Sequence, residues 1–222
     1  MSNILLKQAA GIGDIIFCQK IAKILQEQGN KVYWPVLPQL SYIKDYIRCD
    51  GLAKEPGSEY QLLDLDRAHD LIGGSLLTSK YRMVNLEWQD WQEHVILERN
   101  YKKEKTLFDV LNLQNKKFIL VNNTFGTPPN IQKYEIPVYN PENLHIVYMD
   151  LIEGFNVFDW ALVLERAKKI YTIDTSINYI TEFLNLEADT LEIYSRYKPS
   201  NFSHIEGLWT RVDWKYTPWE NI

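Results

Sequence analysis

The chain has 222 residues, a formal net charge of −5 and 45% hydrophobic residues, which is the composition of an ordinary folded protein. The acidic balance argues against general nucleic-acid binding, so any recognition of phosphate has to be local. No apolar run approaches the roughly 18 residues of a spanning helix, and we expect no membrane span. With two distant cysteines and no leader-like N-terminal pattern, the sequence favours a cytoplasmic setting.

The first predicted element is a buried strand over Asn3 to Gln8, followed by a turn that contains Gly11 and Gly13. Apolar residues then recur at helical spacing, which predicts a helix that Asp14 opens. A second strand begins at Lys31, and a right-handed crossover makes it parallel to the first. Strand ends that lead into helices are where open α/β sheets bind ligands, so this turn is the first candidate site.

The rest of the first half is less regular. A charged stretch from Arg99 to Lys105 leads into a helix, and a strand pattern resumes abruptly at Phe118. We therefore expect an N-terminal domain of residues 1–114 and a C-terminal domain of residues 115–222. The other elements expected before this boundary are a short helix over Pro38 to Ile47, a strand over Gln61 to Leu65, loop and helix over 66–84, and a helix over Thr106 to Leu113.

The second half repeats the strand-and-turn order of the opening. A polar turn at 122–126 follows its first strand, and a second polar turn, Asp174-Thr175-Ser176, follows a later one. Asn156 and Asp159 have the spacing of a capping box before a helix at about 157–167. The tail from Pro199 to Ile222 is aromatic and irregular, and we expect it to pack over the domain. The predicted strands are 117–122, 144–149, 169–173 and 191–194.

Three stretches carry a resemblance to a known family: ILLKQAAGIGDIIF at the start, FILVNNTFG in the middle, and FDWALVLERAKKIYTIDTSINYITEFL near the end. They resemble the heptosyltransferase-like glycosyltransferases. That resemblance implies an α/β fold of the GT-B type, in which two Rossmann-like domains with parallel sheets face a central cleft. It also implies metal-independent, inverting transfer of a sugar from a nucleotide-sugar donor to a hydroxyl acceptor, such as a glycan or a lipid-linked sugar, with no further cofactor.

The resemblance also assigns roles to residues. The aspartate that ends the glycine turn is the family's proposed general base, so Asp14 takes that role. The family motif of Asp-Thr-Gly, two further residues and His is matched only in part, because Ser176 and Tyr179 replace Gly and His. The candidate donor and phosphate ligands are Gly11, Gly13, Asn123, Thr124, Lys133, Asp174, Thr175, Ser176 and Asn178.

Other interpretations stay open. The glycine turn lacks the third glycine of a dinucleotide fingerprint and the Gly-Lys-Ser/Thr end of a phosphate loop, so it supports neither function. It is equally an ordinary tight turn with Asp14 as helix cap, and the Asp174 turn is equally a cap cluster. Asp64-Leu65-Asp66 matches the Asp-x-Asp metal motif of the other large glycosyltransferase fold, GT-A. The four histidines are scattered, and we expect no metal site.

An acceptor pocket is a further hypothesis. Lys80, Tyr81, Trp88 and Trp91 supply cationic and aromatic groups that can contact a sugar, although core packing explains the tryptophans better. The competing functions are a non-catalytic binding or assembly protein with the same fold and another nucleotide-sugar enzyme, such as an epimerase.

Overall fold

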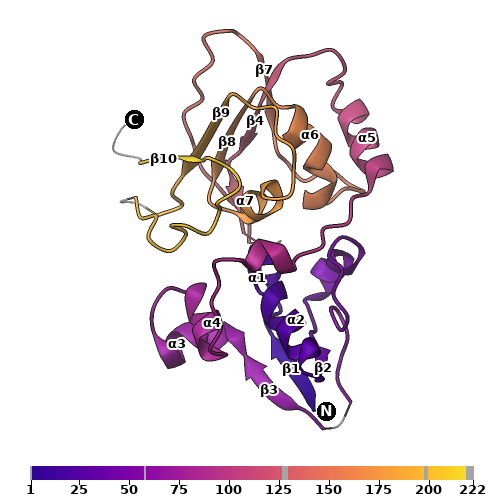
Figure 1. Ribbon diagram of the computed structural model, residues 1–222. Helices are drawn as coiled ribbons and strands as arrows, with labels where there is room; N and C mark the ends of the chain where they lie inside the picture. The colour runs from indigo at the N-terminus through magenta and orange to yellow at the C-terminus, as the bar shows by residue number, and fades with distance from the viewer. Residues whose placement is uncertain (1, 58, 127–129, 198–199, 219–222) are drawn as a thin grey trace. The chain divides into compact units, whose positions relative to one another are not determined.

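The computed structural model describes residues 2–57, 59–126, 130–197 and 200–218. The chain folds into two compact units, Met1–Glu98 and Arg99–Ile222 (Figure 1). Within the described ranges, every helix is too short or too polar to traverse a lipid bilayer.

The first unit is built on a three-stranded parallel sheet of order β2-β1-β3. The central strand pairs on both sides, with Leu5 opposite Tyr33 on one side and Leu62 on the other. Its strands, helices and 3₁₀ turns (η) are β1 (Asn3–Lys7), α1 (Ile12–Phe17), α2 (Gln19–Glu27), β2 (Lys31–Tyr33), η1 (Pro38–Asp45), β3 (Gln61–Asp64), η2 (Leu65–Arg67), α3 (Ala68–Ile72), α4 (Thr78–Met83) and η3 (Trp91–His94).

The helix after the glycine turn differs in detail from the prediction. It is interrupted at Cys18, which ends α1 and begins α2. Asp14 does not open the helix: Gly11 is the N-cap residue, and Asp14 lies two residues inside α1, in its first turn. Gly11 has φ +78°, a conformation that a residue with a Cβ adopts only with strain. The turn therefore requires glycine at this position.

The second unit contains a five-stranded parallel sheet of order β10-β9-β8-β4-β7 and a small hairpin of β5 and β6. Its central strands β4 and β8 are buried throughout, as their continuous apolar sequences predict for parallel strands covered on both faces. The elements are α5 (Tyr101–Val110), β4 (Phe118–Asn122), β5 (Thr124–Phe125), β6 (Gln132–Lys133), β7 (His145–Tyr148), η4 (Val157–Trp160), α6 (Ala161–Arg166), β8 (Lys169–Ile173), α7 (Ser176–Thr181), β9 (Thr190–Tyr194) and β10 (Lys215–Thr217).

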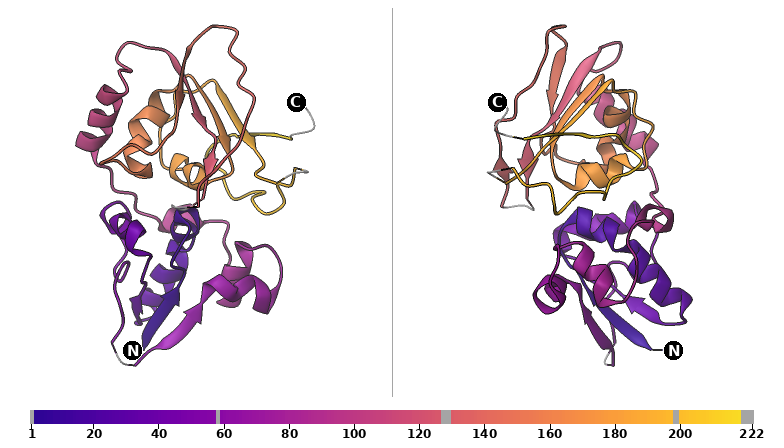
Figure 2. Two further views of the ribbon diagram at one scale, coloured as in Figure 1. Left: turned by 180° about the vertical axis from the view of Figure 1, so that it is seen from behind. Right: turned by 60° about the vertical axis from the view of Figure 1, so that its left-hand side comes forward.

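The two faces of this sheet are covered differently. Helices α5, α6 and α7 lie on one face, while the irregular segment after the hairpin crosses the other (Figures 1 and 2). Tyr134, Ile136 and Val138 of that segment pack against a buried cluster that includes Val121 and Tyr171. An extended, proline-containing connection thus replaces a second layer of helix on this face.

The tail is more regular than expected, because β10 adds an edge strand to the sheet. Trp209 and Trp214 are buried, so this part of the tail does pack back onto the domain. Trp219 lies outside the described residues.

The predicted boundary at 114/115 differs from the division of the structure, which falls between Glu98 and Arg99. The charged stretch that was expected only to lead into a helix at Thr106 already contains the first turn of α5, and the Asn100 side chain caps the helix by accepting from Lys103 N at 3.1 Å. Helix α5 packs against η4 and α6 of the second unit. Arg99 secures this start: it donates to Glu165 at 2.7 Å and to the buried Glu104 at 3.0 Å.

We expect Arg99→Ala to lower the free energy of unfolding by about 3 kcal/mol, because it leaves the buried Glu104 carboxylate without its cation. Arg166→Ala is the matched control: it removes the same side chain from an ion pair with Glu187 in which both partners are more than half exposed, and it should cost less than about 1 kcal/mol. Urea denaturation followed by circular dichroism measures both. Equal losses would contradict the anchoring role of Arg99.

Candidate functional site

The glycine turn of the first unit places a carboxylate beside a buried ammonium group. Asp14 Oδ1 accepts a hydrogen bond from Lys80 Nζ at 2.5 Å. Lys80 is buried on α4, whereas the Asp14 side chain stays 34% exposed. A Cβ on Gly11 would lie 2.5 Å from Asp14 Oδ2, so the glycine leaves the space that this carboxylate oxygen occupies. The Asp14 carboxylate is thus hydrogen-bonded by Lys80, has the space that it needs beside Gly11, and remains partly exposed to solvent.

Lys80 has anionic and polar neighbours that compensate for its burial. Burial acts to lower the pKa of the ammonium, but the neighbouring Asp14 and Asp66 carboxylates favour its charged form, and the pKa lies above its ordinary value. Lys80 also donates to Gln8 Oε1 at the end of β1. Lys80 is therefore a buried ion-pair partner of Asp14. The sequence suggested an exposed contact for an acceptor, and the burial of Lys80 contradicts that prediction.

The aromatic residues predicted for an acceptor pocket pack around Phe17 of α1. Its ring lies 4.8 Å from that of Tyr81, 5.7 Å from Trp91 and 6.4 Å from Trp88. Tyr81 and Trp91 have no exposed surface, so they form core and offer no face to a sugar. Trp88 is partly exposed and is the one ring of the three that can contact a ligand.

In the second unit, the structure joins the two polar turns that the sequence singled out. Asn122, at the end of β4, donates to Thr172 Oγ1 at 2.9 Å and to Thr175 Oγ1 at 2.8 Å. Thr175 caps α7, and Asn178 completes the capping box by accepting from Thr175 N at 3.0 Å. Asn178 is wholly buried, so its contribution is to hold the turn. The carboxyl ends of β4 and β8 thus carry one connected group of polar side chains, which we call the polar edge.

Asp174 has partners that the sequence did not indicate. Its side chain is 1% exposed, and its Oδ2 accepts from His204 Nε2 at 2.6 Å. Its Oδ1 accepts from the backbone N–H of Arg196 at 3.0 Å, and the Arg196 guanidinium lies 3.5 Å from Oδ2. Asp174 therefore ties the segment after β9 to the end of β8 and is closed to direct contact with a phosphate. The sequence held no signal for these pairings, because no motif spacing links them.

The remaining predicted ligands differ in how far they are buried. Asn123 is buried and donates to Tyr134 O at 2.9 Å, and its Oδ1 has no hydrogen-bond partner within the described part of the chain. Thr124 and Ser176 are partly exposed at the same edge of the sheet. Lys133 pairs with Thr124 in the hairpin, and its ammonium lies 5.8 Å from the centre of the Tyr148 ring on β7. Gly13 is buried inside α1.

The Asp-x-Asp motif is engaged within the first unit. Asp64 Oδ2 accepts a hydrogen bond from Lys7 Nζ at 2.8 Å. The ammonium group therefore lies beside the carboxylate that would have to bind the metal if this were a GT-A motif. Over the described residues, no three His, Cys, Asp or Glu side chains are grouped so as to hold a metal ion. The expected absence of a metal remains a prediction.

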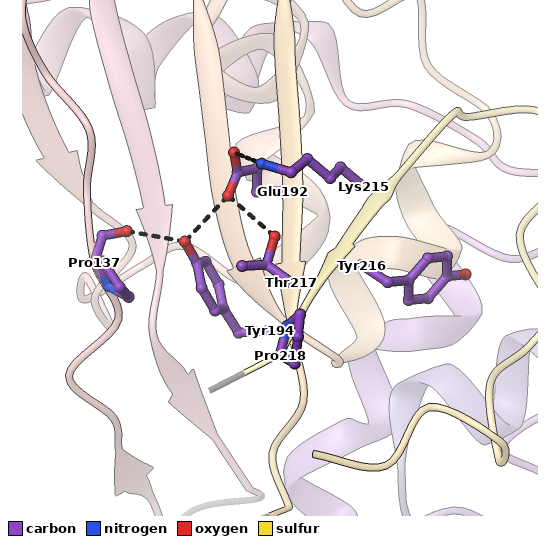
Figure 3. A pocket seen from close by; sticks show the side chains of 7 residues that line it. All are labelled: Pro137, Glu192, Tyr194, Lys215, Tyr216, Thr217 and Pro218. Carbon is purple, nitrogen blue, oxygen red and sulfur yellow. Dashed lines mark hydrogen bonds and ion pairs between the residues drawn. The ribbon is translucent and has the colours of Figure 1, made fainter. Parts of the chain in front are cut away.

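A surface pocket lies on the second unit, away from the predicted residues (Figure 3). At its centre, Glu192 accepts from Lys215 at 2.9 Å and from Thr217 at 3.1 Å. Tyr194 donates toward the same carboxylate at 3.2 Å. Glu192 is thus already hydrogen-bonded by its own chain, and none of the candidate donor ligands lines this pocket.

Comparison with solved structures finds similar bacterial proteins at low sequence identity. The E. coli ADP-heptose LPS heptosyltransferase II aligns with 98% of this chain and 90% of its own, at 9% identity and a TM-score of 0.51. A glycosyl transferase of family 9 from Veillonella parvula aligns over 97% of this chain and 87% of its own, at 9% identity and a TM-score of 0.49. Neither a protein-family model nor a curated protein matches the sequence. The first likeness confirms the predicted α/β fold of the GT-B type with its parallel sheets.

The contact between Gly11 and Asp14 predicts a coupling between the two positions. Gly11→Ala should destabilise the protein by about 2 kcal/mol more than Gly29→Ala, because both glycines need positive φ but only Gly11 would displace a carboxylate paired with buried Lys80. In an Asp14→Ala background the extra loss should disappear, since the obstructing side chain is gone. Denaturant unfolding of the four variants measures this cycle. A Gly11→Ala loss that is unchanged by Asp14→Ala would refute it.

Proposed function

We propose that the protein is a glycosyltransferase that moves a sugar from a nucleotide-sugar donor to a hydroxyl acceptor. The observation that carries this proposal is the Asp14 carboxylate, which is partly exposed in the first turn of α1, after β1, and held by Lys80 at 2.5 Å. A positioned carboxylate at a strand end suits a general base. The fold shared with a heptosyltransferase supports the same reaction class.

In the proposed reaction, Asp14 takes the proton of the acceptor hydroxyl as its oxygen attacks the anomeric carbon of the donor sugar. The new carbon–oxygen bond forms while the bond to the diphosphate oxygen breaks, and the electron pair leaves with the nucleoside diphosphate. One displacement from the opposite face inverts the configuration at the anomeric carbon. Lys80 keeps the carboxylate oriented, and the exposed part of Asp14 remains open to the acceptor.

The leaving diphosphate requires stabilisation of its developing charge. We assign this task to the polar edge of the second unit, where Thr124 and Ser176 offer partly exposed hydroxyl groups. Without a metal, a protein cation has to neutralise the rest of the charge. Both cysteines are free thiols, which agrees with action in a reducing compartment such as the cytoplasm.

Donor binding is tested first. A nucleoside diphosphate or nucleotide sugar that binds the folded chain should raise its melting temperature, because ligands of the native state stabilise it. Differential scanning fluorimetry with the diphosphates and common sugar conjugates of A, G, C and U measures the shift. If no nucleotide stabilises the protein at millimolar concentration, the donor assignment fails.

Once a donor is found, Asp14→Asn should reduce the transfer rate at least about 100-fold while nucleotide affinity stays within about twofold, since the proposed reaction uses the carboxylate for proton transfer and not for nucleotide binding. Asp109→Asn is the control: it removes a carboxylate that is also paired with a lysine, Lys105, on the exposed surface of α5. A product assay by mass spectrometry follows both variants. Equal loss of binding and transfer in Asp14→Asn would indicate a structural role.

The same assays separate the alternatives. Activity that requires Mn²⁺ and is lost in Asp64→Asn would favour a metal-dependent enzyme. Conversion of the donor sugar without any acceptor would indicate an epimerase. Nucleotide binding with no turnover of any donor would favour a non-catalytic binding or assembly protein.

A further inference from the structure

The resemblance assigns the diphosphate cation to Lys133, but the structure offers a different side chain at the polar edge. Lys133 lies on β6 with its ammonium over Tyr148, on the β7 side of the central strand β4. Its side chain is exposed, and among the described residues the Tyr148 ring is the one group with which this side chain interacts. A flexible lysine without a hydrogen-bond partner is less well oriented for a phosphate than a guanidinium held by its neighbours.

Arg196 occupies the opposite side of the same edge, at the end of β9. Its guanidinium lies 4.7 Å from the centre of the Phe125 ring and 5.5 Å from that of Tyr197. Because Phe125 belongs to the 122–126 turn and Asp174 to the other turn, Arg196 touches both of the polar turns at once. Its side chain is nevertheless 25% exposed, so part of the guanidinium remains accessible.

Asp174 and the aromatic rings hold Arg196 in a defined orientation. The carboxylate accepts from the Arg196 backbone N–H at 3.0 Å and attracts the Nε side of the guanidinium at 3.5 Å. No hydrogen bond of the two Nη groups to the described residues is present, whereas these groups can bond two phosphate oxygens in parallel. His204 contacts the same Asp174 oxygen, so Arg196 shares this carboxylate with a second partner.

From this arrangement we infer that Arg196, and not Lys133, is the cation that binds the diphosphate of the donor. The inference rests on the proposed function and identifies the group that replaces a metal in it. Asp174 acts here as a positioning residue, which explains how a buried carboxylate can lie beside a site for an anion. The ligand class is a pyrophosphate ester, read by its two charged phosphates and not by its base or sugar.

The experiment compares Arg196→Gln with Lys133→Gln as the matched control, since both changes remove one positive charge from this edge of the second unit. The probes are ADP, GDP, CDP, UDP, AMP and inorganic pyrophosphate, and isothermal titration calorimetry measures their affinities. Arg196→Gln should weaken the best diphosphate about 10- to 100-fold, the loss expected for a bidentate charge-assisted contact, and Lys133→Gln about twofold or less. Arg196→Lys should restore only part of the loss, because an ammonium cannot bind in the same bidentate way.

Circular dichroism spectra and melting temperatures of all three variants show whether the fold persists, and the partial rescue by Arg196→Lys separates lost charge from lost structure. A Lys133→Gln loss larger than that of Arg196→Gln would overturn the inference while leaving the proposed function standing. Arg196-dependent binding of pyrophosphate without turnover of any nucleotide sugar would support the inference and contradict the proposed function. Failure of the unmodified chain to bind any of the six probes would overturn both.

Discussion

Two carboxylates, one in each unit, lie after a parallel strand, and each forms an ion pair with a distant part of the chain. In the first unit, Asp14 follows β1 and is paired with Lys80, which is 66 residues away in the sequence. In the second unit, Asp174 follows β8 and is paired with His204 and Arg196, which are 30 and 22 residues away. Each pairing folds a distant segment against the end of a strand, so the site and the tertiary structure depend on the same contacts.

The two carboxylates nevertheless differ in what they can do. Lys80 contacts one oxygen of Asp14 and leaves the side chain 34% exposed, so a substrate hydroxyl can reach the carboxylate. Asp174 is 1% exposed, and both of its oxygens have partners from its own chain. Of the two carboxylates, only Asp14 is therefore open to a substrate, and it is the one to which the proposed reaction assigns proton transfer; Asp174 instead positions the residues around it. Two similar strand-to-helix turns in the sequence thus have different chemical roles.

The second sheet has an unusual cover for its parallel strands. The connection from β4 to β7 contains no helix within its described residues, and Tyr134, Ile136 and Val138 cover the sheet in its place. The β5–β6 hairpin, which belongs to this connection, places the Phe125 ring against the Arg196 guanidinium. Phe125 is therefore part of the polar edge because the connection after β4 is an irregular segment and not a helix.

Local sequence patterns determined most of the secondary structure. The strands β1, β4, β8 and β9 and the capping box at Asn156 fall where apolar runs and cap residues placed them, because these signals act over a few residues. The start of α5 was placed too late because its first turn is charged and lacks an apolar periodicity, although Asn100 is a cap signal. Strand β10 was missed because three residues of an edge strand carry little pattern. Asp14 and the two polar turns were likewise recognisable from glycine, aspartate and hydroxyl residues after strands.

Only the tertiary structure decided which partners these residues have. The pairings of Asp14 with Lys80 and of Asp174 with His204 and Arg196 join segments that no periodicity connects. Burial also divided the aromatic residues, since Tyr81 and Trp91 form core while Trp88 keeps an exposed surface. The sequence by itself determined where polar groups follow buried strands. Which of them stay open to a ligand depended on long-range packing, because exposure and charge pairing are properties of residues brought together from distant parts of the chain.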